Sequence, residues 1–189
     1  MKLPIISYGD PILKRKGEAI EKDYPGLQQL IADMFETMYA ASGVGLAAPQ
    51  IGRSIRLFVI DASPYKEDEP GLADFKKVFI NAELLEEEGD KWLFNEGCLS
   101  IPEVREDISR YPTIRIRYLD ENWVEHEEVL GGLAARITQH EYDHIEGKLF
   151  TDKLSPLRKA MIKSKLDSIS RGQVKVEYKM KFPASKRKR

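Results

Sequence analysis

The sequence predicts an α+β fold, because its helix signals and its strand signals occupy different stretches of the chain. Strand-like runs gather between residues 55 and 129. Apolar residues at helical spacing occur before this region, at 25–39, and after it, at 133–147 and 157–169. A pair of alternating strands joined by a short polar turn indicates antiparallel pairing. With 189 residues, 42% of them hydrophobic, the chain suits one domain with a substantial core.

The first predicted helix, at 25–39, carries an apolar stripe at the spacing i, i+3, i+4, i+7 and i+11, formed by Leu27, Leu30, Ile31, Met34 and Met38. We expect Asp23 to cap this helix and the chain to enter it at Pro25. Such a stripe is typical of packing on a core.

A glycine-rich loop is predicted from Gly43 to Gln50. Its Gly-x-Gly-x-x-Ala pattern is a permitted form of the dinucleotide-binding fingerprint, which must follow a strand and open a helix. Here a helix precedes the pattern and Pro49 blocks a helix after it. The loop is therefore interpreted as a place where the backbone approaches another group closely.

The strand signals form five runs, at 55–61, 78–81, 92–100, 114–118 and 123–129. The last two alternate in polarity and flank a turn at Asp120–Asn122, which predicts a hairpin. We expect 62–74 to be an exposed loop and the acidic stretch Glu83–Asp90 to be a solvated turn.

The helix predicted at 133–147 carries the pattern His140-Glu141-Tyr142-Asp143-His144. Residues at i and i+4 lie one turn apart on the same face, so two imidazoles can bind one divalent metal ion. The glutamate between them can reach a water held by that ion. The sequence therefore predicts a hydrolytic metal site, with two helix-surface histidines as the alternative.

The third ligand would decide the class of enzyme. One protease class places a further histidine where this chain has Phe150, which excludes that class, and Asp167 is a weak candidate in the last helix. Cys98 is the better candidate, because a thiolate is a strong soft ligand and Gly97 beside it permits close approach. The alternative is that Cys98 is a buried free cysteine.

Composition and charge limit the partners and the compartment. The formal net charge of −1 gives the chain no overall electrostatic attraction to DNA or to an acidic membrane. No apolar run approaches the roughly 20 residues needed to span a bilayer, and the first residues lack the pattern of a signal peptide. Cys98 is the single cysteine. We therefore expect a cytoplasmic protein without a disulfide.

The last part of the chain is basic, with eight Lys or Arg against one acid between residues 171 and 189. Residues 174–180 alternate like an edge strand or an ordered tail. We expect residues 1–182 to form one catalytic domain and 183–189 to be a disordered basic tail.

Three motifs occur in order: Gly43–Gln50, Glu96–Ser100 and Gln139–His144. Together they resemble the signature motifs of the peptide deformylase family, and the similarity spans about residues 43–147. It implies mixed, mostly antiparallel sheets packed around a central helix that carries His-Glu-x-x-His. It also implies hydrolysis of the N-formyl group from the formyl-methionine of nascent polypeptides, with release of formate. Ile145 replaces a leucine common in the family, and the basic C-terminal extension is not explained by the resemblance.

The resemblance implies roles for individual residues. Cys98, His140 and His144 would bind the metal, with a water in the fourth position. Glu141 would take the proton of the water and pass it to the leaving amine. The Gln50 amide and the Leu99 N–H would face the developing oxyanion. The substrate backbone and methionine side chain would contact Val44, Gly45, Gly97 and Ile137, with Arg105 and Arg136 at the rim.

The family usually works with Fe²⁺, while Zn²⁺, Ni²⁺ or Co²⁺ occur in some preparations. Within enzymes, a small metalloprotease or other amidase built on the same helix is the alternative. A second alternative is a ribosome-associated binding protein, acting near the exit tunnel through its basic tail, with a merely structural metal.

Overall fold

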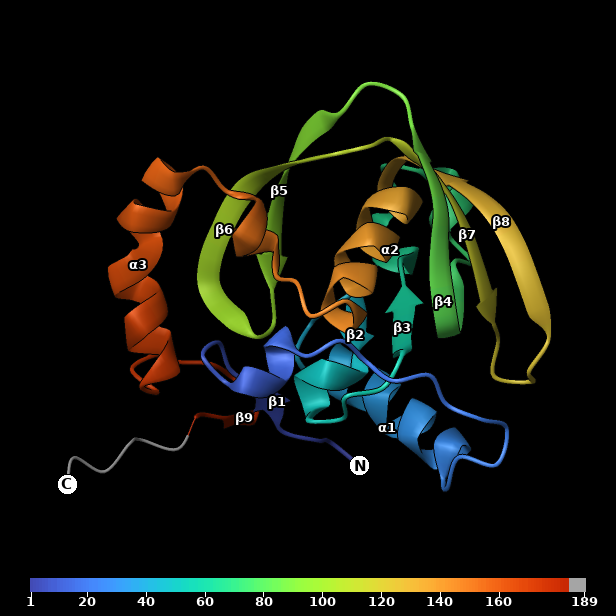
Figure 1. The fold of residues 1–189 in the computed structure, drawn as a ribbon, viewed down its shortest axis with the longest axis horizontal. Coiled ribbons are helices and arrows are strands. Elements are labelled where there is room, and N and C mark those ends of the chain that lie inside the picture. The colour runs from blue at the N-terminus through green and yellow to red at the C-terminus, as the bar shows by residue number, and fades with distance from the viewer. Residues whose placement is uncertain (184–189) are drawn as a thin grey trace.

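A helix lies at the centre of the fold, between a five-stranded antiparallel sheet and a long hairpin (Figure 1). The structure is a computed structural model, and it describes residues 1–183. The central helix is α2 (Gly132–Ile145), which carries the His-Glu-x-x-His pattern. The hairpin consists of β5 (Trp92–Cys98) and β6 (Ile101–Arg110).

The five-stranded sheet has the order β2-β3-β4-β7-β8, and each neighbouring pair is antiparallel. Its strands are β2 (Gly45–Ala47), β3 (Leu57–Asp61), β4 (Lys76–Glu88), β7 (Thr113–Leu119) and β8 (Glu125–Gly131). The short strands β1 (Ile5–Ile6) and β9 (Met180–Lys181) pair in parallel, so that segments near the two ends of the described chain meet. The α+β prediction, with mostly antiparallel sheets around this helix, is confirmed.

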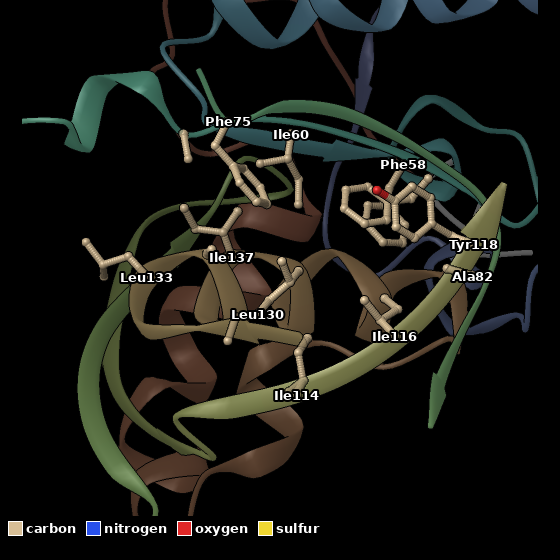
Figure 2. Close-up of a cluster of buried hydrophobic side chains, with 14 of the residues drawn as sticks. Phe58, Ile60, Phe75, Ala82, Ile114, Ile116, Tyr118, Leu130, Leu133 and Ile137 are labelled. Atoms are coloured by element: carbon tan, nitrogen blue, oxygen red, sulfur yellow. The ribbon is translucent and has the colours of Figure 1, made fainter. Parts of the chain in front are cut away.

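Apolar packing between α2 and the sheet forms one core cluster (Figure 2). Leu133 and Ile137 of α2 are buried in this cluster with Phe58, Ile114 and other sheet residues. Burial of a side chain of this size contributes roughly 1.5–3 kcal/mol. The first half of α2 is thus fixed on the sheet, which sets the place of the histidines in its second half.

Two further helices complete the fold. α1 (Leu27–Ala40) buries the predicted Met and Leu stripe in a second cluster, and α3 (Pro156–Ser170) lies outside β6 (Figure 1). The predicted cap of α1 is wrong. The helix starts after Gly26, whose φ of 69° is left-handed and which caps without a side chain, so Asp23 and Pro25 precede the helix.

The acidic stretch that was expected to be a solvated turn is largely strand. β4 continues to Glu88 and pairs with β7 along this stretch. Glu83 and Glu86 lie opposite the arginines of β7, with Glu86–Arg115 and Glu83–Arg117 separations of 2.9 and 2.6 Å. Cross-strand opposite charges stabilise a ladder whose residues alone favour a turn.

Strand β6 was not predicted from the sequence, and its pattern of burial explains why. Its alternate residues face inward, but the inward positions include Glu106 and Arg110 as well as Val104 and Ile108. Glu106 is paired with Arg158 of α3 at 2.7 Å. Buried charges interrupt the apolar alternation that reveals a strand in a sequence.

The C-terminal segment is an ordered tail with strand pairing at its end. Of the range 174–180, only Met180 falls in β9, and the preceding residues form no regular element and bend at 177 and 178. The expected tail at 183–189 lies, except for Pro183, outside the described residues. Within 1–183, no helix is both long and apolar enough to cross a membrane.

Candidate active site

One cavity of about 600 Å³ is lined by residues that are far apart in the sequence. Eleven of the twelve residues assigned to the site from the sequence line it: Val44, Gly45, Gln50, Gly97, Cys98, Leu99, Arg105, Arg136, Ile137, His140 and Glu141. The twelfth, His144, is 1% exposed, and its Nε2 lies 3.4 Å from the Cys98 Sγ. The structure therefore brings the whole predicted set to one place.

Three side chains form a cluster of metal-binding atoms. The donor atoms of Cys98, His140 and His144 all lie within 4.8 Å of one another. α2 supplies the two imidazoles one turn apart, and the end of β5 supplies the thiol. One sulfur and two nitrogens suit a divalent transition metal, and three protein ligands leave a position open, as in catalytic sites.

Glu96 orients His140, one of the three members of this cluster. Its carboxylate is 5% exposed and lies 3.0 Å from His140 Nδ1. The Nδ1–H of His140 donates to it, so the Nε2 of the same ring is left for a metal. Two buried guanidinium groups also donate to Glu96, with 2.7 and 2.9 Å from Arg110 and 3.0 Å from Arg136.

The charges around Glu96 decide its ionisation. Burial opposes the charged form, but the hydrogen bonds from His140 and Arg110 outweigh burial and hold the pKa of Glu96 well below its usual range. Arg110 also donates to Asp143 of α2 at 2.7 Å, which ties β6 to the helix. Glu96 and Asp143 are recognisable in the sequence only as members of motifs without a role of their own, and no sequence signal points to Arg110.

Glu141 points into the cavity beside the cluster. Its side chain is buried, and its Oε2 has no hydrogen-bond partner within residues 1–183. Burial raises the pKa of Glu141 to about 7, although the charges of His140 and Arg110 lower it. An unpartnered buried carboxylate oxygen next to a cavity fits a water or substrate group at that point.

The predicted glycine-rich loop is not a loop along its whole length, because its residues form β2 and a 3-10 helix at Ala48–Ile51. The close approach expected of this segment is found, since it lies directly against Glu141. A Cβ atom on Gly45 would collide with the Glu141 carboxylate, so only glycine fits there. Gln50, at the other end of the loop, accepts a hydrogen bond from the Ala47 N–H at 2.9 Å through its Oε1. Its Nε2 therefore faces the site, 3.4 Å from Cys98 Sγ and 3.2 Å from Ser100 Oγ.

The two arginines expected at the rim lie in different places. Arg105 is exposed at the cavity edge and is held by Asn95 at 2.8 and 2.7 Å. Arg136 is only 2% exposed and binds Glu96 and the Ile108 and Trp92 carbonyls, so it lies in the interior rather than at the rim. The expected rim position is wrong for Arg136, because its guanidinium is used to neutralise Glu96.

A Cys-His-His cluster beside a buried glutamate in an open cavity defines a metal-dependent hydrolase. A model of the polypeptide deformylase family matches residues 2–160. The chain belongs to this family, and it is an enzyme that removes the N-formyl group from nascent polypeptides. It uses a divalent metal ion, which the three donor atoms fit.

Curated relatives and solved structures agree on the family. The chain is 59% identical to the peptide deformylase of Christiangramia forsetii and 56% identical to that of Flavobacterium johnsoniae, each over 100% of both chains. The crystal structure of a peptide deformylase from Legionella pneumophila superposes with a TM-score of 0.79 at 40% identity. That alignment covers 92% of this chain and 98% of the other.

Proposed function

We propose that Cys98, His140 and His144 hold the metal ion and that Glu141 is the proton-transfer group for hydrolysis of N-formyl-methionyl peptides. The observation that carries this proposal is the convergence of the three donor atoms, within 4.8 Å, beside the buried Oε2 of Glu141, which has no hydrogen-bond partner among residues 1–183. A divalent ion held there would act as a Lewis acid and lower the pKa of a water molecule from about 15.7 to about 7.

Glu141 acts first as a base and then as an acid. It takes the proton of the attacking water while the carbon–oxygen bond forms at the formyl carbon. It then gives that proton to the departing amine as the carbon–nitrogen bond breaks, which releases formate. Its burial removes competing water from the carboxylate, and Gly45 lets the backbone of the loop lie directly against it.

Gln50 and Leu99 stabilise the oxygen of the formyl group as it gains negative charge. The Gln50 Oε1 is held by the Ala47 N–H, so its Nε2 is oriented as a donor before substrate arrives. Leu99 lies in the two-residue turn between β5 and β6, next to the proposed ligand Cys98, and it offers its N–H. Loss of one such donor typically costs about 10²–10³ in rate.

The substrate lies along the cavity between the loop and β5. Val44, Gly45 and Gly97 contact its backbone, and Ile137 contributes to an apolar pocket for the methionine side chain. An unbranched thioether adapts to such a pocket. Arg105, exposed at the edge, meets residues further along the peptide. For Arg136, burial supports a positioning role behind the site.

Fe²⁺ is the proposed metal in the cell, because one thiolate and two imidazoles suit ferrous iron as well as zinc. The test is turnover of a formyl-methionyl peptide by anaerobically purified protein, with metal analysis of the same sample. Cys98→Ala should lose both metal and activity. A variant that retains metal and activity would favour the metalloprotease alternative, which needs only the helix.

We further infer a single catalytic domain over residues 1–182, a cytoplasmic location and contact with the ribosome near the exit tunnel. The pairing of β1 with β9 near the two ends of that range supports the domain boundary. The eight basic residues among 171–189 support contact with RNA. Truncation after Phe182 should leave peptide turnover unchanged and weaken co-sedimentation with ribosomes at low salt; equal co-sedimentation would refute the contact.

A further inference from the structure

The segment Val174–Tyr178 forms part of the wall of the active-site cavity. Lys175, Val176, Glu177 and Tyr178 all line it. These residues follow α3 and lie beyond residues 2–160, where the family model matches. The motifs that define the family thus do not account for this wall.

The segment lies against the body of the protein and bends at Glu177 and Tyr178. Val174, Val176 and Tyr178 are half-buried, while Lys175, Glu177 and Lys179 are exposed. Such alternation is expected of a chain segment that keeps one face against the protein. The end of the segment is fixed by β1, where the Ile5 and Ser7 N–H groups donate to the Lys179 and Lys181 carbonyls at 2.8 and 2.9 Å.

Tyr178 connects this segment to the turn between β5 and β6. Its ring packs against the core cluster that contains Ile5 and Leu46, and its hydroxyl donates to the Leu99 carbonyl at 2.8 Å. The next carbonyl of the same turn, that of Ser100, accepts the Tyr8 N–H at 2.8 Å. Two parts of the chain that are distant in sequence therefore hold two successive peptide groups of the turn.

We propose that Tyr178 is a positioning residue for deformylation, which acts by fixing the turn that carries the Leu99 N–H. The inference rests on the proposed oxyanion role of Leu99. The hydrogen bond to the Leu99 carbonyl restricts rotation about the bonds on both sides of the Leu99 Cα, and so keeps the N–H directed at the formyl oxygen. A donor that is preorganised toward developing charge is effective only if its direction is held.

The test compares Tyr178→Phe with Tyr24→Phe in the metal-loaded enzyme. Phenylalanine keeps the ring and removes only the hydroxyl. Tyr24 is a matched control, because it is also half-buried and packs against the same cluster, away from the turn. We expect Tyr178→Phe to lower kcat about tenfold, less than loss of a direct donor. KM, the inhibition constant of the deformylated product peptide and metal content should match those of Tyr24→Phe, whereas the melting temperature should be lower by about 2–4 °C because the Leu99 carbonyl loses this partner.

An unchanged kcat would overturn the inference. So would a Tyr178→Phe protein that loses metal or binds the product more weakly than the control, because those changes indicate a general structural role. Gln50→Ala, measured in parallel, separates this inference from the proposed function. If Gln50→Ala lowers kcat about 10²-fold or more and Tyr178→Phe does not, only the role of Tyr178 fails. If Gln50→Ala has no effect, the oxyanion assignment fails and the inference fails with it.

Discussion

Glu96 carries the most consequential prediction, because one buried carboxylate balances two buried guanidinium groups and orients one proposed ligand. The perturbation is Glu96→Gln, which keeps the shape of the side chain and removes its charge. The side chains of Arg110 and Arg136 are each 2% exposed, so both would remain charged in the interior without their main counter-ion. The amide oxygen of the glutamine can accept a hydrogen bond from one guanidinium group, but the uncharged amide neutralises the positive charge of neither arginine.

The magnitude follows from the burial of this network. Removal of one partner from a buried ion pair costs about 3–5 kcal/mol. The lower figure applies here, since Asp143 still neutralises Arg110 in part, at 2.7 Å. For a chain of this length, about 2–4 °C of melting temperature corresponds to each kcal/mol, so a loss of about 3 kcal/mol predicts a decrease of about 6–12 °C. Loss of the acceptor for His140 Nδ1–H should also weaken metal binding about 10–100-fold.

The assay is urea unfolding of the chelator-treated protein, so that bound metal does not contribute to the free energy of unfolding. Competition with a metal indicator then gives the affinity separately. The matched control is Glu86→Gln, which removes an exposed partner of Arg115 at 2.9 Å and should change stability by less than about 1 kcal/mol. If Glu96→Gln behaved like this control in both measurements, the account of the buried network would be refuted.

Three further results are expected. Gly45→Ala should reduce turnover strongly while leaving metal content intact, because the added Cβ displaces the Glu141 carboxylate. Full activity of this variant would contradict the prediction and would show that the backbone at residue 45 moves away instead. Burial raises the pKa of Asp61, but hydrogen bonds from Ser63 and Tyr39 outweigh burial and lower this pKa in the folded protein. The charged Asp61 therefore stabilises the fold at pH values above its ordinary pKa of about 4. This contribution is lost as the pH falls through the lower pKa of the folded state. The stability difference between wild type and Asp61→Asn should therefore shrink on acidification, and a difference independent of pH would contradict this. The iron-loaded enzyme should lose activity in air faster than the zinc-loaded one, which parallel time courses would reveal.

Nine of the twelve proposed site residues could be assigned from the sequence because they lie in three contiguous motifs, whereas Arg105, Arg136 and Ile137 lie outside those motifs. His140 and His144 need only a helix to meet, and the apolar residues at 133 and 137 already indicate that helix. Cys98 was assigned through the resemblance, since nothing in the spacing alone places residue 98 beside residue 144. The Cys98 thiol does lie against His144, because β5 ends at the cavity that α2 lines.

The parts that could not be predicted are those held by charge between distant elements. The side chain of Arg110 in strand β6 points inward, where it pairs with Glu96 and Asp143. From the sequence alone an arginine is expected at the surface, because its partners are distant in the chain. The expected solvated turn at Glu83–Asp90 is wrong for the same reason, since the arginines that make it a strand lie about 30 residues further on, as for Glu86 and Arg115. Pairing of this kind leaves no periodicity in a single segment.

The residues that support the reaction centre therefore come from other parts of the chain than most of the residues proposed to carry out the reaction. Most of the groups proposed to touch metal and substrate come from three short motifs, whereas Arg110 and Tyr178, which support them, come from β6 and the C-terminal segment. Arg110 acts on the metal ligands through Glu96, and Tyr178 acts on the Leu99 turn from nearly 80 residues away. Relatives that keep the three motifs can accordingly differ in catalytic efficiency through these supports. The decisive comparison is between these two variants. We expect Glu96→Gln to weaken metal binding, and we expect Tyr178→Phe to lower kcat while metal content stays unchanged.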